Sequence, residues 1–271
     1  MLATLKEVLE KAEQGNYAVG AFNCTSLESG MAIVETAEEL NSPVILQYAD
    51  SHRHLISIDV IGPIMLQLAK IAKVPVVVHL DHGASIESCR HAVDMGFTSV
   101  MYDASAKPFE DNVAETRSVV EYAHERGASV EAELGHILTS KAGAAEGNGK
   151  SYTREEAYTD PEMAKEFIER TNVDALAIGF GTAHGIYTEK PVLDLNRIAL
   201  IKSAKDIPYV MHGGSGLSEE EYRTAIHNGI RKINYYTYLS LAGGRGVMQY
   251  LEDKKDKDAI YFEDIAKAGI T

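Results

Sequence analysis

The sequence predicts one domain of the α/β class that spans residues 1–271 and folds as a (β/α)8 TIM barrel. The chain has 271 residues, close to the ~250 residues typical of this fold. Short apolar runs alternate with longer amphipathic stretches, as in repeated βα units. The apolar runs are continuous, rich in Val, Ile and Ala, and often bounded by Pro or Gly. Such runs are typical of parallel strands that are covered on both faces.

Eight apolar runs are candidate strands. In chain order they are AVGAF (18–22), PVILQY (43–48), PVVVHL (75–80), TSVMY (98–102), ASVEAEL (128–134), DALAIGF (174–180), PYVMH (208–212) and IRKIN (230–234). An open doubly wound sheet is the alternative architecture. It would require an edge strand or a split strand, which the sequence does not show.

The stretches between the strands carry apolar residues at helical spacing. In the first of them Met31, Val34 and Ala37 form one stripe that can pack against the barrel. The helix candidates are 28–41, 56–73, 85–95, 109–126, 160–171, 195–204 and 218–228. In a barrel built this way, the functional residues gather at the C-terminal ends of the strands.

Composition and charge exclude several classes of protein. A formal net charge of −14 argues against a nucleic-acid partner, because a basic face supplies most of that affinity. The two cysteines cannot form a disulfide framework, and we expect a cytoplasmic protein. The N-terminal stretch carries acids, unlike a secretory signal, and no apolar run suits a membrane span. The last residues, IAKAGIT, resemble the middle of a helix, so we expect a further terminal segment.

Three histidines lie at the ends of apolar runs, and each is followed by glycine. His82, His184 and His212 occur in HLDHG, GTAHG and MHGGSG. Three imidazoles at three strand ends can share one metal ion and leave coordination positions open, which is the design of a catalytic zinc site. The alternative is three unrelated histidines in caps or loops. Their common strand–His–Gly context favours the shared ion.

Carboxylates surround the proposed metal. Asp81 precedes His82, Asp103 follows the fourth strand, and Glu133 lies near the end of the fifth. Asp81 could exchange a proton with a substrate hydroxyl or could orient a histidine. Asp103 and Glu133 could form a second or alternative cation site, or could orient the ligands, and the sequence does not separate these roles. His79 lies inside a strand, where we expect it to pack beneath the site.

Glycine-rich loops suggest an anion site beside the metal. HGGSG (212–216), GTAHG (181–185) and KINYYT (232–237) follow successive strands. Glycine lets the backbone approach an anion, and the helices that follow offer free N–H groups. A phosphate site after the last two strands recurs in barrels. A metal beside a phosphate cradle favours proton removal or C–C cleavage next to a carbonyl.

One loop is unusually long and rich in glycine. Residues 135–153 contain four glycines and little hydrophobic pattern. Long loops after barrel strands often carry function. The sequence is consistent with a mobile lid and equally with a disordered surface loop.

In this order along the chain, the motifs HLDHG, VEAELGH, GTAHGIY, HGGSGLS and KIN-x-x-T resemble those of the class II, zinc-dependent ketose-bisphosphate aldolases. That family includes fructose-bisphosphate and tagatose-bisphosphate aldolases. The resemblance implies that His82, His184 and His212 bind catalytic Zn²⁺ and that Asp81 handles the C4 hydroxyl proton. It implies a second divalent site at Asp103 and Glu133. The implied ligands of dihydroxyacetone phosphate are Gly185, Gly213, Ser215, Asn234 and Thr237.

The resemblance also implies a reaction and partners. The expected substrate is a small sugar phosphate, cleaved between C3 and C4 to dihydroxyacetone phosphate and an aldehyde. A Na⁺ or K⁺ ion at the glycine loops is expected to support the phosphate. The acid that protonates the enediolate lies on the loop after the fifth strand, where Glu146 is the only acid within 135–149. Family members are usually homodimers or homotetramers.

The chain departs from the family where the far phosphate of the substrate would bind. The fructose-bisphosphate members commonly carry N-x-D-T-D-x-R after the last strand. Here Tyr236 and Tyr238 replace the two acids, and Ser240 replaces the arginine. A basic D-P-R segment nearer the C-terminus reads YFED in this chain. Ala49 stands where a serine is usual.

These departures predict that the dihydroxyacetone phosphate half is recognised normally while the aldehyde half is not. The substrate is then a ketose 1-phosphate without a far phosphate, or Arg53 or Arg245 binds a different anion there. Another metal-dependent barrel enzyme, an isomerase or a hydrolase, is one alternative, but strand one lacks the H-x-H pair of barrel hydrolases. A non-catalytic sugar-phosphate-binding relative is the other alternative. The retained histidines and Asp81 argue against it.

Overall fold

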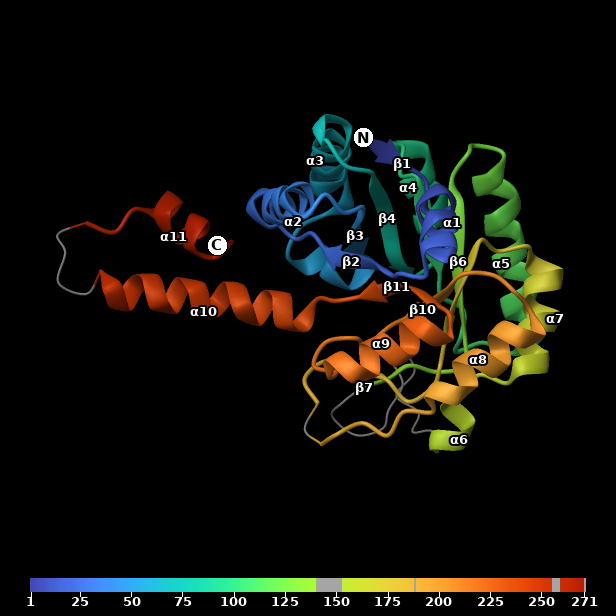
Figure 1. Cartoon of the computed structure of the whole chain (residues 1–271). Coiled ribbons are helices and arrows are strands. Elements are labelled where there is room, and N and C mark those ends of the chain that lie inside the picture. Colours follow the sequence, from blue (N-terminus) through green and yellow to red (C-terminus); the bar gives the residue numbers. More distant parts are fainter. Residues whose placement is uncertain (140–152, 188, 255–258, 271) are drawn as a thin grey trace.

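The computed structural model describes residues 1–139, 153–187, 189–254 and 259–270, and it confirms the barrel (Figure 1). The predicted strands all form and pair in parallel, and the sheet closes because β5 pairs with both β4 and β6. The barrel strands are β2 (Val19–Asn23), β3 (Val44–Ala49), β4 (Val76–Gly83), β5 (Ser99–Tyr102), β6 (Ser129–Leu134), β8 (Ala175–Ile178), β10 (Tyr209–Met211) and β11 (Ile230–Asn234).

The predicted helices also form and surround the barrel. They are α2 (Leu27–Glu39), α3 (Ile58–Ile71), α4 (Ile86–Met95), α5 (Phe109–His124), α7 (Pro161–Thr171), α8 (Leu195–Ala204) and α9 (Glu219–Asn228). Local sequence explains where several begin. The hydroxyls of Ser26, Ser85 and Ser218 each accept a hydrogen bond from the first turn of the following helix. Such caps replace backbone partners that a helix start lacks.

Other elements were not delimited by the sequence pattern. Two of them pair: β7 and β9 form a small parallel ribbon beside the barrel. These elements are β1 (Leu2–Ala3), α1 (Leu5–Gly15), the 3₁₀ helix η1 (Asp50–His54), β7 (Leu138–Thr139), α6 (Arg154–Ala157), β9 (Ala183–His184), α10 (Thr237–Asp253) and α11 (Phe262–Ala268). Most of the glycine-rich loop 135–153 lies outside the described residues.

The barrel interior is apolar only at its N-terminal end. There α1 closes the barrel, and its Leu5 and Leu9 pack in one cluster with Val19, Ile45 and Val77 from the strands. A second and larger apolar cluster fills the space between the strands and the outer helices. Burial of these two clusters supplies the main driving force for folding.

Further along the strands, the inward positions become polar. Gln47, His79, Glu131 and Lys232 are all completely buried. The strand register places Gln47 beside His79, and the residues two positions further along each strand lie at the C-terminal mouth. Because alternate strand residues share a face, the barrel lumen changes from apolar to polar along its axis. The polar end is where the site forms.

The helices α10 and α11 extend away from the barrel as an arm (Figure 1). Neither helix contains a buried residue, and they pack on each other. Beyond α11 the chain returns toward α2, where Ile270 lines a shallow pocket with residues of that helix. Within the described ranges, no helix combines the length and apolar character needed to cross a membrane.

Candidate active site

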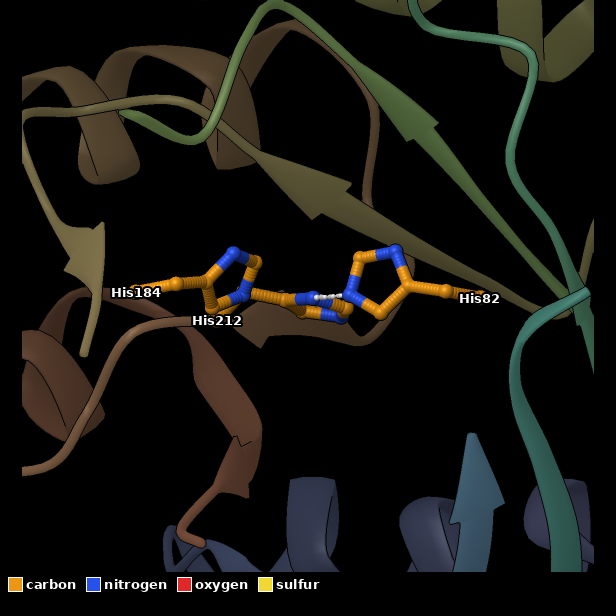
Figure 2. Close-up of side chains that lie close together, drawn as sticks. All are labelled: His82, His184 and His212. Carbon is orange, nitrogen blue, oxygen red and sulfur yellow. Dashed lines mark hydrogen bonds between the residues drawn. The ribbon is translucent and has the colours of Figure 1, made fainter. Parts of the chain in front are cut away.

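Three histidine rings converge at the C-terminal mouth of the barrel. His82 comes from β4, His184 from β9, and His212 directly follows β10. One nitrogen of each ring lies within 4.8 Å of the others, and Figure 2 shows the rings turned toward one another. His212 Nδ1 lies 2.9 Å from His82 Nε2. The structure therefore brings together the three predicted ligands from distant parts of the sequence.

A local distortion of β4 turns His82 into the site. Asp81 points into the barrel, so a regular strand would direct the next side chain outward. Instead, the pairing of β4 with β5 shifts register between Leu80 and Gly83, and His82 has φ of 45°. Such bulges re-aim side chains near active sites, and the left-handed conformation costs roughly 1–3 kcal/mol for a residue other than glycine. Both Asp81 and His82 consequently face the cavity.

Hydrogen bonds on the outer nitrogens orient two of the rings. His82 Nδ1 contacts Asp103 Oδ2 at 2.9 Å, and His212 Nε2 contacts Glu131 Oε1 at 2.9 Å. An ionised carboxylate only accepts hydrogen bonds, so each of these nitrogens donates its proton. His82 Nε2 then directs its proton at the lone pair of His212 Nδ1, and a bound ion would take the place of that proton. Two imidazole ligands of tetrahedral Zn²⁺ lie about 3.4 Å apart, so this pair needs to open only slightly to hold the ion.

The two rings differ in their electrostatic surroundings. Burial opposes protonation of His82, but the charges of Asp81 and Asp103 outweigh it and hold the pKa of His82 well above its usual value. Burial, together with the neighbouring His82, holds the pKa of His212 well below its usual value. Positive charge is therefore favoured at His82, between the acids, and disfavoured on the ring of His212. A divalent ion fits this distribution and this donor set.

Asp81 is held as a buried carboxylate by three amides. Asn23 Nδ2 and Gln47 Nε2 donate to Oδ2 at 3.2 Å, and Asn234 Nδ2 donates to Oδ1 at 3.0 Å. Burial opposes ionisation, but His82 and the other neighbouring positive charges lower the pKa of Asp81 to about 2. Asp81 is thus ionised near neutral pH and oriented, as a general base must be. Sequence reasoning missed Asn23 and Gln47, although both occupy inward strand positions.

Asp103 and Glu133 also lie beside the histidines. Asp103 uses one oxygen for His82, and the other accepts hydrogen bonds from the backbone N and hydroxyl of Ser105 at 3.0 and 2.8 Å. Glu133 Oε2 lies 3.9 Å from His212 Nδ1. His82, Asp103 and Glu133 form a second group of potential ligand atoms within 4.8 Å. The two groups share His82, so they are not independent sites.

A cavity of about 280 Å³ opens in front of these groups. Its wall includes every residue predicted to hold phosphate, and Tyr236 joins them from the residue before α10. The predicted residues on its wall are Asp81, His82, His184, Gly185, Gly213, Ser215, Asn234 and Thr237. The other described residues on the wall are Asn23, Ala49, Ser51, His52, Gly214 and Tyr236.

His212, Asp103 and Glu133 lie behind this wall, beside the other histidines, whereas Arg53 and Glu146 are not brought to the site. The Arg53 side chain is 71% exposed and pairs with Asp50 at 3.4 Å, outside the cavity. Glu146 lies outside the described residues. In place of Arg53, the neighbouring His52 lines the cavity, with its ring 4.6 Å from that of Tyr236. None of the described lining residues is Lys or Arg.

The glycine loops are locked in place around the cavity. Gly213 has φ of 63°, and a Cβ there would lie 2.5 Å from the carbonyl oxygen of Ala183. Tyr187 Oη bridges the same two loops: it accepts from Ala183 N and donates to Gly213 O, both at 2.8 Å. The adjoining helix α9 has a serine cap and three acids in its first turn. The first turn of α10 has neither, so its N-terminus is the more favourable one for an anion.

Sequence reasoning also missed Glu131 and Lys232, which lie below the histidines. Lys232 Nζ donates to Glu131 Oε2 at 2.7 Å, and both side chains are fully buried. His79 lies beside them, as expected for a residue packed beneath the site. The two-residue alternation of VEAEL could have identified Glu131, because it shares the inward face with Glu133.

Comparison with known proteins agrees with this geometry. The family model of class-II fructose-bisphosphate aldolase matches residues 3–270. A fructose-bisphosphate aldolase of Staphylococcus aureus is 40% identical over 94% of this chain and 88% of its own length, and one of Staphylococcus epidermidis is 39% identical over the same shares. The crystal structure of the YdjI aldolase of Escherichia coli K12 is 34% identical, with a TM-score of 0.84 and coverage of 100% and 93% of the two chains. The chain therefore belongs to the class-II fructose-bisphosphate aldolase family.

Proposed function

We propose that this aldolase reversibly cleaves a ketose 1-phosphate or ketose bisphosphate into dihydroxyacetone phosphate and an aldehyde. One observation carries the proposal: three imidazoles converge within 4.8 Å beside a buried carboxylate, in a cavity walled by glycine loops. A metal-binding trio alone would suit many reactions. The ionised, oriented Asp81 next to it supplies a base, and the loops supply a place for phosphate.

His82, His184 and His212 would hold one Zn²⁺ ion, and their number leaves positions open for substrate. When bound, the ion would stabilise negative charge that develops on the substrate carbonyl oxygen. Asp103 orients His82 through the 2.9 Å contact, and we propose this as its main role. With Glu133 it also provides an alternative position for a divalent ion, because that group shares His82.

The remaining residues either transfer a proton or bind the phosphate of the substrate. Asp81 accepts the C4 hydroxyl proton while the C3–C4 bond breaks, and Asn23, Gln47 and Asn234 keep its oxygens aimed. Gly185, Gly213 and Ser215 from the loops after β9 and β10, with Thr237 at the start of α10, hold the phosphate through backbone N–H groups and hydroxyls. A Na⁺ or K⁺ ion at the loop carbonyls would support that phosphate. The acid that returns a proton to the product is proposed to be Glu146.

The far end of the cavity favours a substrate that lacks a second phosphate. Ala49, His52 and Tyr236 form its wall, and no Lys or Arg is among the described lining residues. Neither Arg53 nor Arg245 lines the cavity, and both are exposed. Aromatic and hydroxyl groups suit the hydroxylated chain of a sugar, whereas a phosphate dianion requires positive charge or a cluster of donors. A ketose 1-phosphate is therefore the proposed substrate.

An aldol assay with a panel of acceptors tests the proposal. Dihydroxyacetone phosphate is offered with aldehydes that differ only in carrying or lacking a terminal phosphate. We expect turnover to stop with a chelator, to return with Zn²⁺, and to favour the acceptors without phosphate. A preference for the phosphorylated acceptor by orders of magnitude would refute the substrate assignment. Turnover that ignores the chelator would refute the metal-dependent mechanism, and no turnover with any acceptor would favour a binding protein.

We also propose that the protein is a homodimer or homotetramer in the cytoplasm. The arm supports the first part, because α10 projects from the barrel with Leu241, Met248 and Leu251 exposed on it. These positions are seven and three residues apart, which places them on one helix face. Exposed apolar faces of this kind commonly mark protein contacts. The two free cysteines, both buried, suit a reducing compartment.

A further inference from the structure

Below the three histidines lies a charged cluster that the proposed chemistry does not use. It consists of Glu131, Lys232 and His79, whose side chains are all completely buried. They come from β6, β11 and β4, on different sides of the barrel lumen. Charged groups in the interior require strong partners to offset their loss of water. The partners that they have form a continuous chain leading to His212.

Each link of this chain has hydrogen-bonding geometry. Lys232 Nζ donates to Glu131 Oε2 at 2.7 Å, and the other oxygen of Glu131 accepts from His212 Nε2 at 2.9 Å. On its far side Lys232 Nζ lies 3.4 Å from His79 Nε2. His79 Nδ1 lies 2.8 Å from Ser99 Oγ. Glu131 is thus held between an ammonium group and an imidazole, one on each oxygen.

The contact to His212 determines which ring nitrogen faces the cavity. Because Glu131 takes the proton on Nε2, the lone pair lies on Nδ1, which is the nitrogen 2.9 Å from His82. Asn234 Nδ2 also approaches His212 Nε2, but at 3.3 Å, and the shorter contact to a carboxylate dominates. A carboxylate free to rotate would fix the ring less firmly. Lys232 removes that freedom from Glu131.

We propose that Glu131 and Lys232 are positioning residues, which together hold His212 with Nδ1 aimed at the metal position. This inference rests on the proposed function for the presence of a metal. A purely structural ion pair is the competing explanation. It is weakened by energetics, since buried ion pairs can often be replaced by apolar residues of similar size without loss of stability. A purely structural ion pair also does not explain why Glu131 contacts His212, a proposed metal ligand.

The neighbouring residue on β11 provides a matched control. Arg231 is also buried, with its side chain 5% exposed, and it pairs with Glu13 at 3.1 Å. Successive strand residues point to opposite faces, so this second ion pair lies outside the lumen. Arg231→Met and Lys232→Met therefore remove equivalent charges from adjacent positions of one strand. Only the second touches the chain that leads to His212.

The experiment compares the full-length wild type with Glu131→Gln, Lys232→Met, the double variant and Arg231→Met. Zn²⁺ affinity is measured by competition with a chromophoric chelator, Co²⁺ coordination by the visible absorption spectrum, and stability by urea unfolding of the metal-free protein. We expect Glu131→Gln and Lys232→Met to bind Zn²⁺ about 10- to 100-fold more weakly, the usual effect of losing a ligand's partner. Arg231→Met should lose stability but keep wild-type affinity and spectrum.

The double variant distinguishes a role of the ion pair in positioning His212 from a role in stabilising the fold. Removing both charges should restore the urea midpoint of the metal-free protein toward wild type, while Zn²⁺ affinity stays as low as in Glu131→Gln. Recovery of affinity together with stability would show that the cluster is only structural and overturn the inference. Wild-type affinity in both single variants would overturn it equally, as would loss of folding in all three. A wild type that binds neither ion would instead refute the metal site itself.

Discussion

At the scale of single residues, the site depends on side chains placed against the regular pattern of a strand. Asp81 and His82 are adjacent, yet both face the cavity because His82 adopts φ of 45°. The histidine lies between Asp81 and Asp103, whose charges raise its pKa despite burial. The two carboxylates therefore favour a cation between them, and His82 in turn lowers the pKa of Asp81. One local distortion therefore places both the proposed base and a proposed metal ligand.

Replacement of Asp81 separates proton transfer from metal binding. Asp81→Ala should lower the turnover number by about 10²- to 10⁴-fold, the usual contribution of a positioned base. Zn²⁺ content should stay near one ion per chain, because the three histidines remain. Turnover is measured with dihydroxyacetone phosphate release and metal content by elemental analysis. Near-normal turnover in a metal-loaded variant would exclude Asp81 as the base.

At the scale of elements, the sequence pattern was sufficient for the strands and the helices around them. Continuous apolar runs marked β2 to β11 of the barrel, because both faces of each strand are covered. The pattern did not reveal the bulge in β4, which depends on pairing between Leu80, Gly83 and the distant β5. It also did not delimit α1, which closes the barrel from below. Long-range pairing and docking are not local properties of the sequence.

The same distinction between local pattern and long-range pairing applies to the site residues. His82, His184 and His212 could be predicted because each ends an apolar run and precedes glycine. Glu131 and Lys232 were missed because each lies inside a run that reads as a strand, and the two residues that pair are 101 positions apart in the sequence. Arg53 was predicted from its charge alone. Its side chain is 71% exposed, because η1 directs it to solvent while His52 faces the cavity.

The glycine loop after β10 permits a test at this scale. Gly213→Ala should raise the Michaelis constant for dihydroxyacetone phosphate at least ~10-fold, since φ of 63° strains any side chain. In addition, the new Cβ would lie 2.5 Å from the Ala183 oxygen and displace the loop. Michaelis constants are obtained from initial rates at saturating aldehyde.

Gly127→Ala is the control for backbone strain. Gly127 has φ of 76°, but a Cβ there would meet nothing within 4 Å. This variant should lose some stability, on the order of 1 kcal/mol, and keep the wild-type Michaelis constant. If both variants change the Michaelis constant equally, the loop contact with Ala183 does not control phosphate binding.

At the scale of the whole molecule, the barrel separates stability from chemistry along its axis. The N-terminal half of the lumen is filled by apolar side chains and closed by α1. The C-terminal half holds Gln47, His79, Glu131 and Lys232, which are polar or charged and fully buried. The apolar half stabilises the fold, and this offsets the cost of burying charge beneath the site. The barrel can therefore carry an ionic interior where an isolated loop could not.

The arm is the one part of the described chain that contributes little to this barrel. Helix α10 has no buried residue, although Met248 is apolar and 71% exposed. If the arm packs on a second copy, a charge at this position should weaken the oligomer by the cost of burying it. Met248→Glu should therefore shift the protein toward monomers in sedimentation velocity at micromolar concentration, while its circular dichroism spectrum stays unchanged.

Leu200→Glu tests whether any apolar surface residue would give the same result. Leu200 is 57% exposed on α8 of the barrel, away from the arm (Figure 1), so this variant should sediment as the wild type does. Equal dissociation of both variants would place the subunit contact elsewhere, and a monomeric wild type would leave the arm without the proposed partner. The candidate active site lies at the barrel mouth, beside the start of α10. Turnover of the Met248→Glu monomer therefore also measures how far catalysis depends on assembly.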